Sequence, residues 1–600
     1  MERTPNISRR SFVAAGAALA GMAAASAGLG TPLLSQAEEA ASNEGMQSEY
    51  EGLEVRHAFC QMCGPARTHC STLCYLKDGR WTNVEGNPQA GNNWGRGSRS
   101  LCAKGNSAMQ VMYSPTRLEY PMKRTGEKGE GKFERITWEQ AIEEISAKLL
   151  EQKEKYGPES YGVLSPQFYA VLGSLGRRFL NVHGSPNYMH SAICNSQRMF
   201  SNLVTLGGPK HAQCNKTMPG QLGKAKLIVN WGYNSENSGI NQGNPNGRLN
   251  AVEKGAQTID IRPMRDALGT HSDIWVPVRP GTDCALAMSV LNYIISNDLY
   301  DHDFVDNWCD GFDELAASVA DCSPEWAEEI TGVPAAQIEQ ISELMGTVKP
   351  MAIFCGNGIG DQQNDGHWAQ ACIDLIEAIT GNIAIEGGSG AAAPSAPSLI
   401  KTSPVDILTD RLPASEEDEA NGWMPGVAKL VAPETPRWFQ TMVTQESGPT
   451  TAYYKGLLSI LTEEPYPLRC VFAQSSNPLT ATRQPKTIIE ALKKLELYVV
   501  MDTEWNSSCD YADYVLPACV NYETDEQFAT KNSKDGTWIG INQKIQEPLG
   551  ESMSDWDFYC KLADAMGYGD DFWHGDFDEC LREQLDGSGF TLEELREKGQ

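Results

Sequence analysis

Four short apolar runs, each followed by a polar or glycine-rich loop, constrain most strongly what this chain of 600 residues can fold into. The runs occupy residues 227–229, 352–354, 470–472 and 497–500. Continuous apolar runs of this length are typical of parallel strands that helices cover on both faces. Ligands of such sheets bind in the loops beyond the carboxyl ends of the strands. The sequence therefore predicts an α/β fold, and four loops of one chemical kind indicate a large, polar, nucleotide-like ligand.

Two other segments indicate how the chain is organised. The chain is too long for one hydrophobic core, so we expect several domains. Residues 137–150 have apolar side chains at helical spacing, and Thr137 with Gln140 matches a capping box, which predicts an amphipathic helix. Residues 390–450 are rich in Ala, Pro and Ser and carry the acidic run 416–419, which we interpret as a solvated face of an inserted surface loop.

The N-terminus has the pattern of an export signal. Arg9 and Arg10 precede an apolar, Ala-rich run over residues 13–29, and small residues near 35–37 suit a cleavage site. We therefore expect residues 1–37 to be a twin-arginine signal peptide read by the Tat translocon, which exports folded proteins. The alternative, a retained anchor, is less favoured because the run is short and weakly apolar for a spanning helix. The expected location is the periplasm or the outer face of the cytoplasmic membrane.

The charge of the chain restricts its partners. The formal net charge is −29. Such a chain is repelled by nucleic acid and by anionic membrane surfaces, so neither is expected as the main partner. An anionic cofactor would have to be held by local donors.

Cysteines gather at the start of the predicted mature chain, at Cys60, Cys63, Cys70 and Cys102. An exported chain with 17 cysteines would ordinarily be interpreted as disulfide-bonded. A protein that folds before export can instead keep its thiolates on a metal, and thiolates are the ligands of iron–sulfur clusters. We therefore expect a polynuclear iron centre here. Lys104, two residues beyond Cys102, is well placed to contact a group that lies behind this centre.

From about residue 56 to its end, the chain resembles the catalytic subunits of molybdopterin oxidoreductases of the dimethyl sulfoxide reductase type. The resemblance rests on the cysteine region with segments 77–80 and 86–88, on segments 259–263, 273–275, 279–286 and 380–382, and on 387–388, 477–478, 511–517 and Glu523. It implies a small β-rich iron–sulfur domain and two doubly wound α/β domains that enclose a bis(molybdopterin guanine dinucleotide) centre.

The resemblance also implies domain boundaries. We expect the [4Fe-4S] domain at residues 50–115, one α/β domain formed by 116–165 with 345–600, and the other α/β domain at 166–344. Similar subunits continue into a C-terminal β-barrel domain. Because this sequence ends at Gln600, we expect that domain to be missing, through a fragmentary record, a split gene or its supply by another chain.

The metal ligands follow from the resemblance. It implies that Cys60, Cys63, Cys70 and Cys102 hold the [4Fe-4S] cluster and that Lys104 lies between the cluster and one pterin. Cys74 is an alternative candidate for the third ligand. Six residues separate Cys63 from Cys70, whereas members of the family commonly have three residues between the second and third ligands. Cys70 is preferred, since it precedes Lys77 by the family's usual interval.

Cys194, within His-Ser-Ala-Ile-Cys-Asn at 190–195, resembles the loop of members that bind molybdenum or tungsten through cysteine, such as polysulfide and thiosulfate reductases. A thiolate suits a metal that already prefers soft sulfur donors, although a lone buried cysteine is more often a core residue. We expect Cys194, together with Lys104, to serve the reaction centre.

The guanine dinucleotides are expected in the loops after the apolar runs. Glycines let backbone N–H groups approach a pyrophosphate, and carboxylates accept hydrogen bonds from guanine or ribose. The resemblance points to Trp231, Gly232, Asn234, Asp260, Arg262, Gly281, Asp283, Gly356, Gly358, Asn477, Pro478, Asp502, Thr503 and Asp513.

Substrate residues do not follow from the sequence. His183, Tyr188, His190, Arg198 and His211 lie near Cys194 in the chain and have the chemistry for proton transfer. Histidines in cores and on surfaces are commoner than catalytic ones, so we assign these residues no role.

The leading hypothesis is an exported reductase that removes an oxygen, hydroxyl or sulfur group from a small acceptor, with electrons supplied through the cluster. Its expected partners are an iron–sulfur electron-transfer subunit and a membrane anchor, and catechols are one conceivable substrate class. One alternative is a non-redox hydratase or transhydroxylase of the same family. In that hydratase branch an aspartate follows the second cluster cysteine, whereas Gly64 stands here. Another alternative is a truncated, inactive chain.

Overall fold

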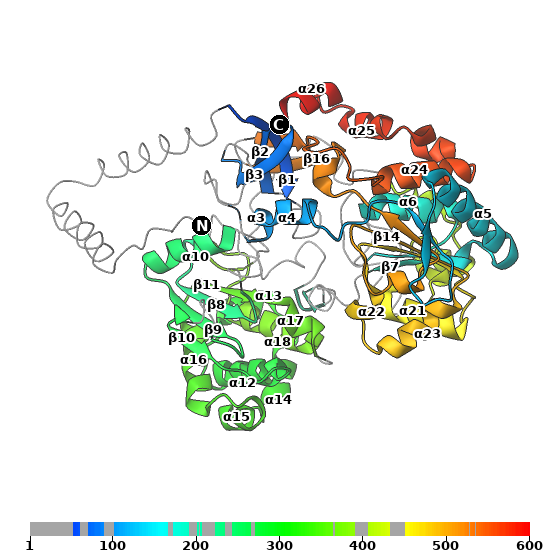
Figure 1. The fold of residues 1–600 in the computed structure, drawn as a ribbon. Helices are drawn as coiled ribbons and strands as arrows, with labels where there is room; N and C mark the ends of the chain where they lie inside the picture. Colours follow the sequence, from blue (N-terminus) through cyan, green and yellow to red (C-terminus); the bar gives the residue numbers. More distant parts are fainter. Residues whose placement is uncertain are drawn as a thin grey trace, which may run out of the picture.

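The structure is a computed structural model that describes residues 52–60, 70–88, 101, 103–165, 172–190, 201–202, 204–206, 222–234, 243–265, 270–363, 366–389, 406–431, 451–526, 528–533 and 536–599. Sheets of three, four and eight strands and one two-stranded hairpin organise these residues. In Figure 1 the four-stranded and eight-stranded sheets form two separate α/β bodies, and the small sheet shares a core with the segment that follows β15 of the eight-stranded sheet.

The small sheet contains β1 (Glu54–Cys60), β2 (Cys70–Lys77) and β3 (Arg80–Gly86), all antiparallel. Asp78 and Gly79 form the turn between β2 and β3, and both have positive φ, as a two-residue hairpin turn of type I′ requires. Two short helices, α3 (Ala103–Asn106) and α4 (Ala108–Met112), follow, and α4 packs on β3. Side chains of this sheet share a core with Tyr522, far along the chain.

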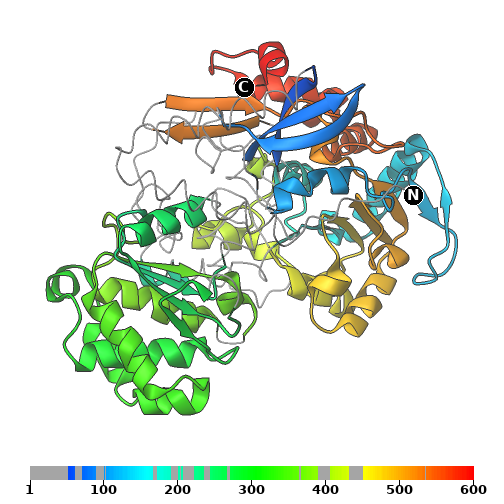
Figure 2. The ribbon, with the colours of Figure 1, turned by 60° about the vertical axis from the view of Figure 1, so that its left-hand side comes forward.

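The end of the chain returns to the small sheet. The amide of Ile541, the last residue of hairpin β16 (Phe528–Ser533) and β17 (Gly536–Ile541), donates to the carbonyl of Gly599 at 3.0 Å. The amide of Gln543 donates to the carbonyl of His57 on β1 at 2.9 Å. Figures 1 and 2 both show the C-terminus beside these strands, so the first and last described segments form one unit.

The four-stranded sheet is parallel throughout, in the order β10 (Ile274–Val276), β9 (Gln257–Ile261), β8 (Leu227–Trp231) and β11 (Met351–Cys355). Successive side chains of β8 enter different cores, because strand residues alternate between faces: Leu227 and Val229 join one cluster, and Ile228 joins the other. The helices of this body are α10 (Gly243–Glu253), α12 (Asp283–Ser296), α13 (His302–Trp308), α14 (Phe312–Val319), α15 (Pro324–Thr331), α16 (Ala335–Thr347), α17 (Asn357–Asp361) and α18 (Gly366–Ile379).

The eight-stranded sheet has the order β12 (Thr451–Ala452), β7 (Tyr188–His190), β6 (Tyr161–Leu164), β13 (Cys470–Gln474), β14 (Leu497–Asp502), β15 (Tyr514–Pro517), β4 (Met122–Arg124) and β5 (Phe133–Arg135). The first six strands are parallel, and β4 and β5 extend the edge antiparallel. The longer helices around it are α5 (Trp138–Tyr156), α6 (Leu172–His183), α21 (Tyr453–Thr462), α23 (Pro485–Lys494), α24 (Asp555–Ala565), α25 (Phe577–Leu585) and α26 (Leu592–Lys598).

Helices cover both faces of this sheet. Phe472 of β13 packs in one core with residues of α5, α6 and α24, whereas Val471 packs in the other with residues of α21 and α23. The predicted helix at 137–150 is α5, and the Thr137 hydroxyl accepts from the amide of Gln140 as expected of a capping residue. All four apolar runs are buried parallel strands, three of them central and β11 at the end of its sheet, which confirms the α/β fold class with its small β-rich N-terminal unit.

The boundaries between the two α/β bodies differ from those predicted. β11 and α18 belong to the four-stranded sheet and its core, although the sequence placed everything after residue 345 in the other body. Conversely, α6 and β7 belong to the eight-stranded sheet rather than to a domain that begins at residue 166. The cause is that buried parallel strands look alike in sequence, so an apolar run does not reveal which sheet it joins.

The segment interpreted as an acidic surface loop contains a short helix, α19 (Glu416–Asn421). Asp418 is fully buried there, where its carboxylate accepts from the amides of Ser415 and Gly426 at 3.0 and 3.2 Å and also from that of Ala428. This residue of the acidic run is therefore structural rather than solvated. Six 3₁₀ turns and one short helix complete the described elements: η2 (Pro158–Ser160), η3 (Thr409–Arg411), η4 (Val427–Lys429), η5 (Cys509–Tyr511), η6 (Asn521–Glu523), η7 (Gly569–Gly575) and α22 (Pro478–Ala481).

None of the helices in the described ranges combines the length and apolar character needed to cross a membrane.

Candidate functional site

The small sheet places two of the predicted cluster cysteines opposite each other. Cys60 ends β1 and Cys70 begins β2, and they are direct partners in the antiparallel register. Directly opposed residues of such a pair have Cβ atoms about 4.5–5.5 Å apart, which suits two thiolates on one compact metal cluster. Cys63 and Cys102 lie outside the described residues.

Cys74 lies in a different environment from Cys70. It is four residues further along β2, about 13 Å at a rise of about 3.3 Å per residue. Its side chain is fully buried in the core with Trp81 and Val84, and its sulfur lies 3.7 Å from the Thr72 hydroxyl. Burial raises the pKa of the Cys74 thiol, which disfavours the thiolate form that a metal binds. This geometry supports Cys70 as the third ligand and makes Cys74 a core residue.

Lys104 lies on α3, the helix that begins directly after Cys102, and its side chain is partly buried. Its helix leads into α4, which packs on β3 of the sheet that carries Cys60 and Cys70. Lys104 thus belongs to the same small unit as the cysteines, and its contact with a pterin stays a prediction.

The four-stranded sheet gathers nine of the predicted nucleotide-binding residues at or just beyond its carboxyl edge. They are Trp231, Gly232 and Asn234 after β8, Asp260 and Arg262 at β9, Gly281 and Asp283 between β10 and α12, and Gly356 and Gly358 after β11. The loops are tied to one another, because the amide of Gly232 donates to the carbonyl of Ile261 at 2.9 Å and that of Gly356 to the carbonyl of Trp231 at 2.8 Å.

Two buried side-chain pairs fix this edge. The indole Nε1 of Trp231 donates to Oδ1 of Asp283 at 2.9 Å, which joins the end of β8 to the first turn of α12. Arg262 Nε donates to Oδ2 of Asp260 at 2.9 Å, and both side chains are almost wholly buried. A pair of opposite charges removed from water is costly unless both partners are satisfied, so Asp260 holds the Arg262 guanidinium at a defined position on the edge.

The eight-stranded sheet presents a second set of predicted residues at its own carboxyl edge. Asn477 and Pro478 follow β13, Asp502 ends β14, and Thr503 comes directly after it. The hydroxyl of Ser508 donates to Oδ1 of Asn477 at 2.8 Å. Burial raises the pKa of the Asp502 carboxyl, which accepts from the amide of Thr503 at 2.7 Å.

Cys194 lies outside the described residues, but its flanks are placed. β7 ends at His190, at the carboxyl edge that also carries Asn477 and Asp502. On the other side, Asn202 Nδ2 donates to Oδ2 of Asp374 on α18 at 2.6 Å. The predicted metal ligand therefore belongs to the connection between the two α/β bodies.

Asp513 lies apart from the other predicted residues. It precedes β15, and its Oδ2 accepts from the amide of Tyr498 near the start of β14, so it is at the amino edge of the eight-stranded sheet. Its carboxylate pairs with Arg124 at 2.5 Å and with Lys128 at 3.1 Å. The predicted role in binding a guanine dinucleotide is thus not supported by this position, where Asp513 ties β15 to β4 and to the turn that follows it.

The residues to which no role was assigned fall in different places. His183 ends α6 and is buried among aromatic rings, and burial lowers its pKa to about 3, so it is a neutral core histidine. The Arg177 guanidinium lies 4.1 Å from the ring centroid of Tyr188, a buried cation–π contact. Arg198 and His211 lie outside the described residues, and so does the side chain of His190.

Sequence reasoning missed a buried polar group behind the β13 loop. Gln474 ends β13, its Nε2 donates to Oδ1 of Asp555 at 3.2 Å, and its Oε1 accepts from the hydroxyl of Tyr559 at 2.8 Å. Burial raises the pKa of Asp555 to about 7. In the sequence Asp555 follows Ser554, which caps α24, so it is indistinguishable from an ordinary first-turn acid.

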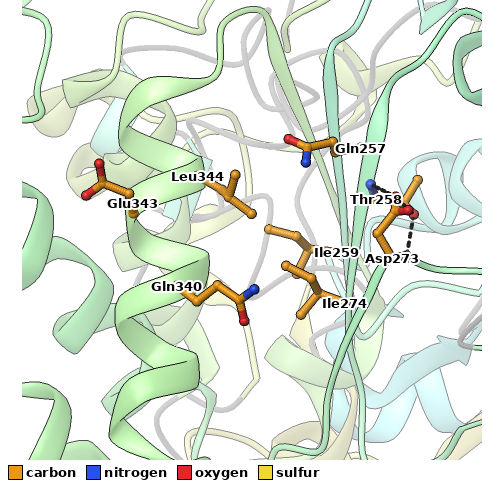
Figure 3. Close-up of a pocket in the computed structure, with 8 residues that line it drawn as sticks. All are labelled: Gln257, Thr258, Ile259, Asp273, Ile274, Gln340, Glu343 and Leu344. Atoms are coloured by element: carbon orange, nitrogen blue, oxygen red, sulfur yellow. Dashed lines mark hydrogen bonds between the residues drawn. The ribbon is translucent and has the colours of Figure 1, made fainter.

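A pocket of about 340 Å³ lies between α16 and strands β9 and β10 (Figure 3). Gln340 and Leu344 extend from α16 toward Ile259 and Ile274, and the amide of Thr258 donates to Oδ2 of Asp273 at 2.8 Å. The pocket reaches Gln257, the first residue of β9, so it opens toward the amino half of the sheet and away from the predicted nucleotide site.

Comparison with known proteins identifies the family to which the chain belongs. The family model described as molybdopterin oxidoreductase matches residues 117–565, and the one described as molybdopterin oxidoreductase Fe4S4 domain matches residues 53–114. The chain belongs to the molybdopterin oxidoreductase family. This confirms the predicted family, an oxidoreductase enzyme, and a molybdenum–molybdopterin cofactor with a [4Fe-4S] cluster.

Relatives within the molybdopterin oxidoreductase family carry different activities in their names. The thiosulfate reductase molybdopterin-containing subunit PhsA of Salmonella typhimurium is 27% identical over 90% of this chain and 68% of its own length. Acetylene hydratase of Syntrophotalea acetylenica is 29% identical over 83% of this chain and 68% of its own length. The solved structure of acetylene hydratase from Pelobacter acetylenicus covers 90% of this chain and 73% of its own, with a TM-score of 0.71 and 26% identity.

The described residues of this molybdopterin oxidoreductase fit those cofactors. A Cβ at Gly356 would lie 1.9 Å from the carbonyl oxygen of Gly232, so the strand-end loops meet more closely than side chains permit. Next to them, the Nδ2 donor of Asn230 is buried without a hydrogen-bond partner in the described part of the chain, as expected where a ligand supplies the acceptor. With the opposed Cys60 and Cys70, these features match a phosphate-rich cofactor and an iron–sulfur cluster.

The two candidates for the third cluster ligand are separable by mutation. Cys70→Ala is expected to abolish the cluster's EPR signal and lower the iron content, because it removes a thiolate from the edge opposite Cys60. Cys74→Ala is expected to keep the iron and to lower the free energy of unfolding by about 1 kcal/mol, since it removes only a buried sulfur. Iron analysis and EPR of both proteins, purified anaerobically, check this, and the reverse pattern would assign the ligand to Cys74.

The buried carboxyl of Asp555 is expected to make stability depend on pH. Its pKa rises from 3.8 to about 7 on folding, so between these values the folded state binds more protons and stability falls as pH rises. Asp555→Asn removes this loss. At about 1.4 kcal/mol per pH unit, the free energy of unfolding of the variant relative to wild type should increase by about 3–4 kcal/mol from pH 4 to pH 7. Urea unfolding across this range tests it, with Asp564→Asn, exposed on the same helix, as the control whose difference from wild type stays flat.

Proposed function

We propose that the protein is an exported reductase that removes an oxygen, hydroxyl or sulfur group from a small acceptor, with electrons entering through the [4Fe-4S] cluster. The observation that carries the proposal is the position of the two described segments that flank Cys194 in the chain. β7 ends at the carboxyl edge of the eight-stranded sheet at His190, and the side chains of Asn202 and Thr205 hydrogen-bond to Asp374 on α18 of the other body. A reaction centre at Cys194 would therefore lie between the two sets of cofactor-binding loops.

The bound metal would supply two-electron chemistry at this position, and the chain's own residues would hold it there. Cys194 would offer a thiolate ligand, which suits molybdenum or tungsten. Asp260, Arg262, Gly232 and Gly356 would orient one guanine dinucleotide at the four-stranded edge, and Asn477, Asp502 and Thr503 the other at the eight-stranded edge. Cys60, Cys63, Cys70 and Cys102 would ligate the cluster, and Lys104 would lie between it and a pterin.

Partners and location are part of the same proposal. Paired Arg9 and Arg10 before an apolar run support export by the Tat translocon to the periplasm or outer face of the cytoplasmic membrane. Similarity to the thiosulfate reductase subunit PhsA and to dimethyl sulfoxide reductase DmsA of Escherichia coli, 27% identical over 95% of this chain and 70% of its own length, supports a reductase. An iron–sulfur subunit with a membrane anchor would deliver the electrons.

A second candidate function has a specific observation in its favour. Acetylene hydratase resembles the chain in both sequence and structure, so a non-redox addition of water is the alternative. The residue after Cys63 is Gly64, which has no side chain to take part in that chemistry.

The test begins with protein purified anaerobically, in which we expect about four iron atoms per chain from one cubane cluster, together with molybdenum or tungsten. Reduced-dye oxidation is then screened with oxyanions, polysulfide, sulfoxides and catechols. Cys194→Ala should abolish turnover and leave the cluster EPR signal unchanged. Retained activity would refute the role of Cys194, and water addition without any response to an acceptor would favour the hydratase.

A further inference from the structure

Two cysteine thiols outside the cofactor site contact each other where α12 packs on α18. Cys284 lies in the first turn of α12 and Cys372 in the middle of α18. The thiols of Cys372 and Cys284 are joined by a hydrogen bond. Both cysteines are reduced, partly exposed and packed against the same hydrophobic core. The two residues are thus partly accessible to solvent, and their thiols lie within hydrogen-bond reach of each other.

A third thiol, Cys322, lies close to this pair and provides a comparison. Cys322 is near enough to Cys284 for two thiolates at these positions to repel each other. The hydrogen bond between thiols, however, joins Cys284 to Cys372. Cys322 is also more deeply buried, at 7% exposed. No set of three or more metal-ligating side chains occurs among the described residues, so these sulfurs do not form a metal site there. The chemistry open to the contacting pair is oxidation.

We propose that Cys284 and Cys372 are an oxidative modification site, at which a reversible disulfide fastens the first turn of α12 to the middle of α18. The oxidant is a small disulfide such as oxidised glutathione. The thiolate of one cysteine attacks it and forms a mixed disulfide, which releases one glutathione thiol. The thiolate of the other cysteine then displaces the second glutathione. The two electrons and two protons of the pair thus end on two glutathione molecules.

The environment of the pair sets how readily this exchange proceeds. The hydrogen bond that the Cys372 thiol donates to Cys284 raises the pKa of Cys372, and burial raises it further. Because the thiolate is the nucleophile, exchange should be slow at neutral pH and faster in mildly alkaline solution. A disulfide needs Cβ atoms about 3.5–4.5 Å apart, so the bond forms only if α12 and α18 bring the two side chains within that range.

The cross-link would act on the neighbouring cofactor edge. Cys284 directly follows Asp283, whose Oδ1 accepts from Trp231 at 2.9 Å. The closed loop between the two cysteines includes β11 and Gly356. Closing a long loop constrains the unfolded chain, so the oxidised protein should resist unfolding more than the reduced one. The proposal does not depend on which reaction the enzyme catalyses.

The test uses holoenzyme treated anaerobically with oxidised glutathione or with dithiothreitol at mildly alkaline pH, while the cluster absorbance is followed. After alkylation and digestion, the oxidised sample should yield the Cys284 and Cys372 peptides linked and two fewer alkylated thiols. Its Tm should lie several degrees above that of the reduced sample. Cys284→Ser and Cys372→Ser should each abolish the link and the Tm difference.

Cys322→Ser is the matched control, because it removes the neighbouring thiol and leaves the pair intact. It should keep both the linked peptides and the Tm difference. Complete alkylation of Cys284 and Cys372 in the oxidised wild type would overturn the proposal. So would a link from either residue to Cys322, or loss of the link in Cys322→Ser. The peptide map of wild-type protein decides the question even if a serine variant does not fold.

Discussion

Replacing Arg117 with methionine is expected to lower the free energy of unfolding by about 3–5 kcal/mol, because it leaves a carboxylate buried without its cation. Arg117 Nη2 donates to Oε2 of Glu523 at 2.8 Å, and the two side chains are 1% and 0% exposed. Nη1 also donates to the carbonyl of Met112 at 3.2 Å, and Nη2 to that of Ala518 at 3.3 Å. Methionine fills much of the space but replaces none of these donors.

The position of the pair extends the effect beyond local stability. Met112 ends α4 of the small cysteine-bearing unit, whereas Ala518 directly follows β15 of the eight-stranded sheet. Glu523 also accepts from the amides of Val520 and Leu549, at 2.7 and 2.8 Å. Arg117 therefore joins the small unit to the larger body, and its loss should also lower the iron content of the purified protein.

Urea unfolding of Arg117→Met and of a matched variant measures the effect. Arg135→Met breaks an ion pair with Glu551 in which the side chains are 59% and 37% exposed, so it should cost less than about 1 kcal/mol. Arg117→Met combined with Glu523→Gln should recover part of the loss, because it removes the unpaired charge. An Arg117→Met protein no less stable than Arg135→Met would show that the buried pair is not stabilising.

Much of the fold was predictable because a strand that is buried on both faces of its sheet appears in the sequence as a continuous apolar run. The runs at 227–229 and 470–472 are fully buried strands, and Thr137 caps the helix it was expected to cap. The sequence of such a run does not show which of the two sheets the strand joins. β11 pairs with β8 through backbone hydrogen bonds, which any apolar residue can form, so its assignment to the other body failed.

In the candidate site too, local sequence predicted some residues, whereas others depend on contacts with distant parts of the chain. Residues after strand ends, such as Trp231, Asp260 and Gly356, were found because parallel strands bring their carboxyl ends to one edge. Asp513 was placed with them on its motif alone, yet it precedes its strand and so lies at the opposite edge. Asp555 was missed because its burial depends on Gln474, 81 residues earlier in the chain.

Gly356→Ala is expected to disrupt the cofactor edge of the four-stranded sheet more than any other single methyl group added there. The new Cβ would lie 1.9 Å from the carbonyl oxygen of Gly232 and 2.5 Å from its carbon, and both are backbone atoms. The φ angle of Gly356 is −79°, which alanine adopts readily, so the penalty comes from this contact alone. The loops after β8 and β11 would have to separate and break the hydrogen bond from Gly356 to Trp231.

Overpacking against backbone exceeds the usual cost of an added methylene group, so we expect Gly356→Ala to lower the free energy of unfolding by more than about 3 kcal/mol. The molybdenum content of the purified protein should fall with it, because the displaced loops carry Trp231 and Gly232.

Gly223→Ala is the matched control, since its Cβ would meet nothing closer than 3.5 Å and it precedes β8, at the amino edge of the same sheet. This variant adds the same methyl group without overpacking, so it should be as stable as wild type, with full molybdenum content. Metal analysis and Tm of the two variants separate the predictions. If both variants keep their metal and their Tm, the close approach of the two loops does not hold the cofactor edge together.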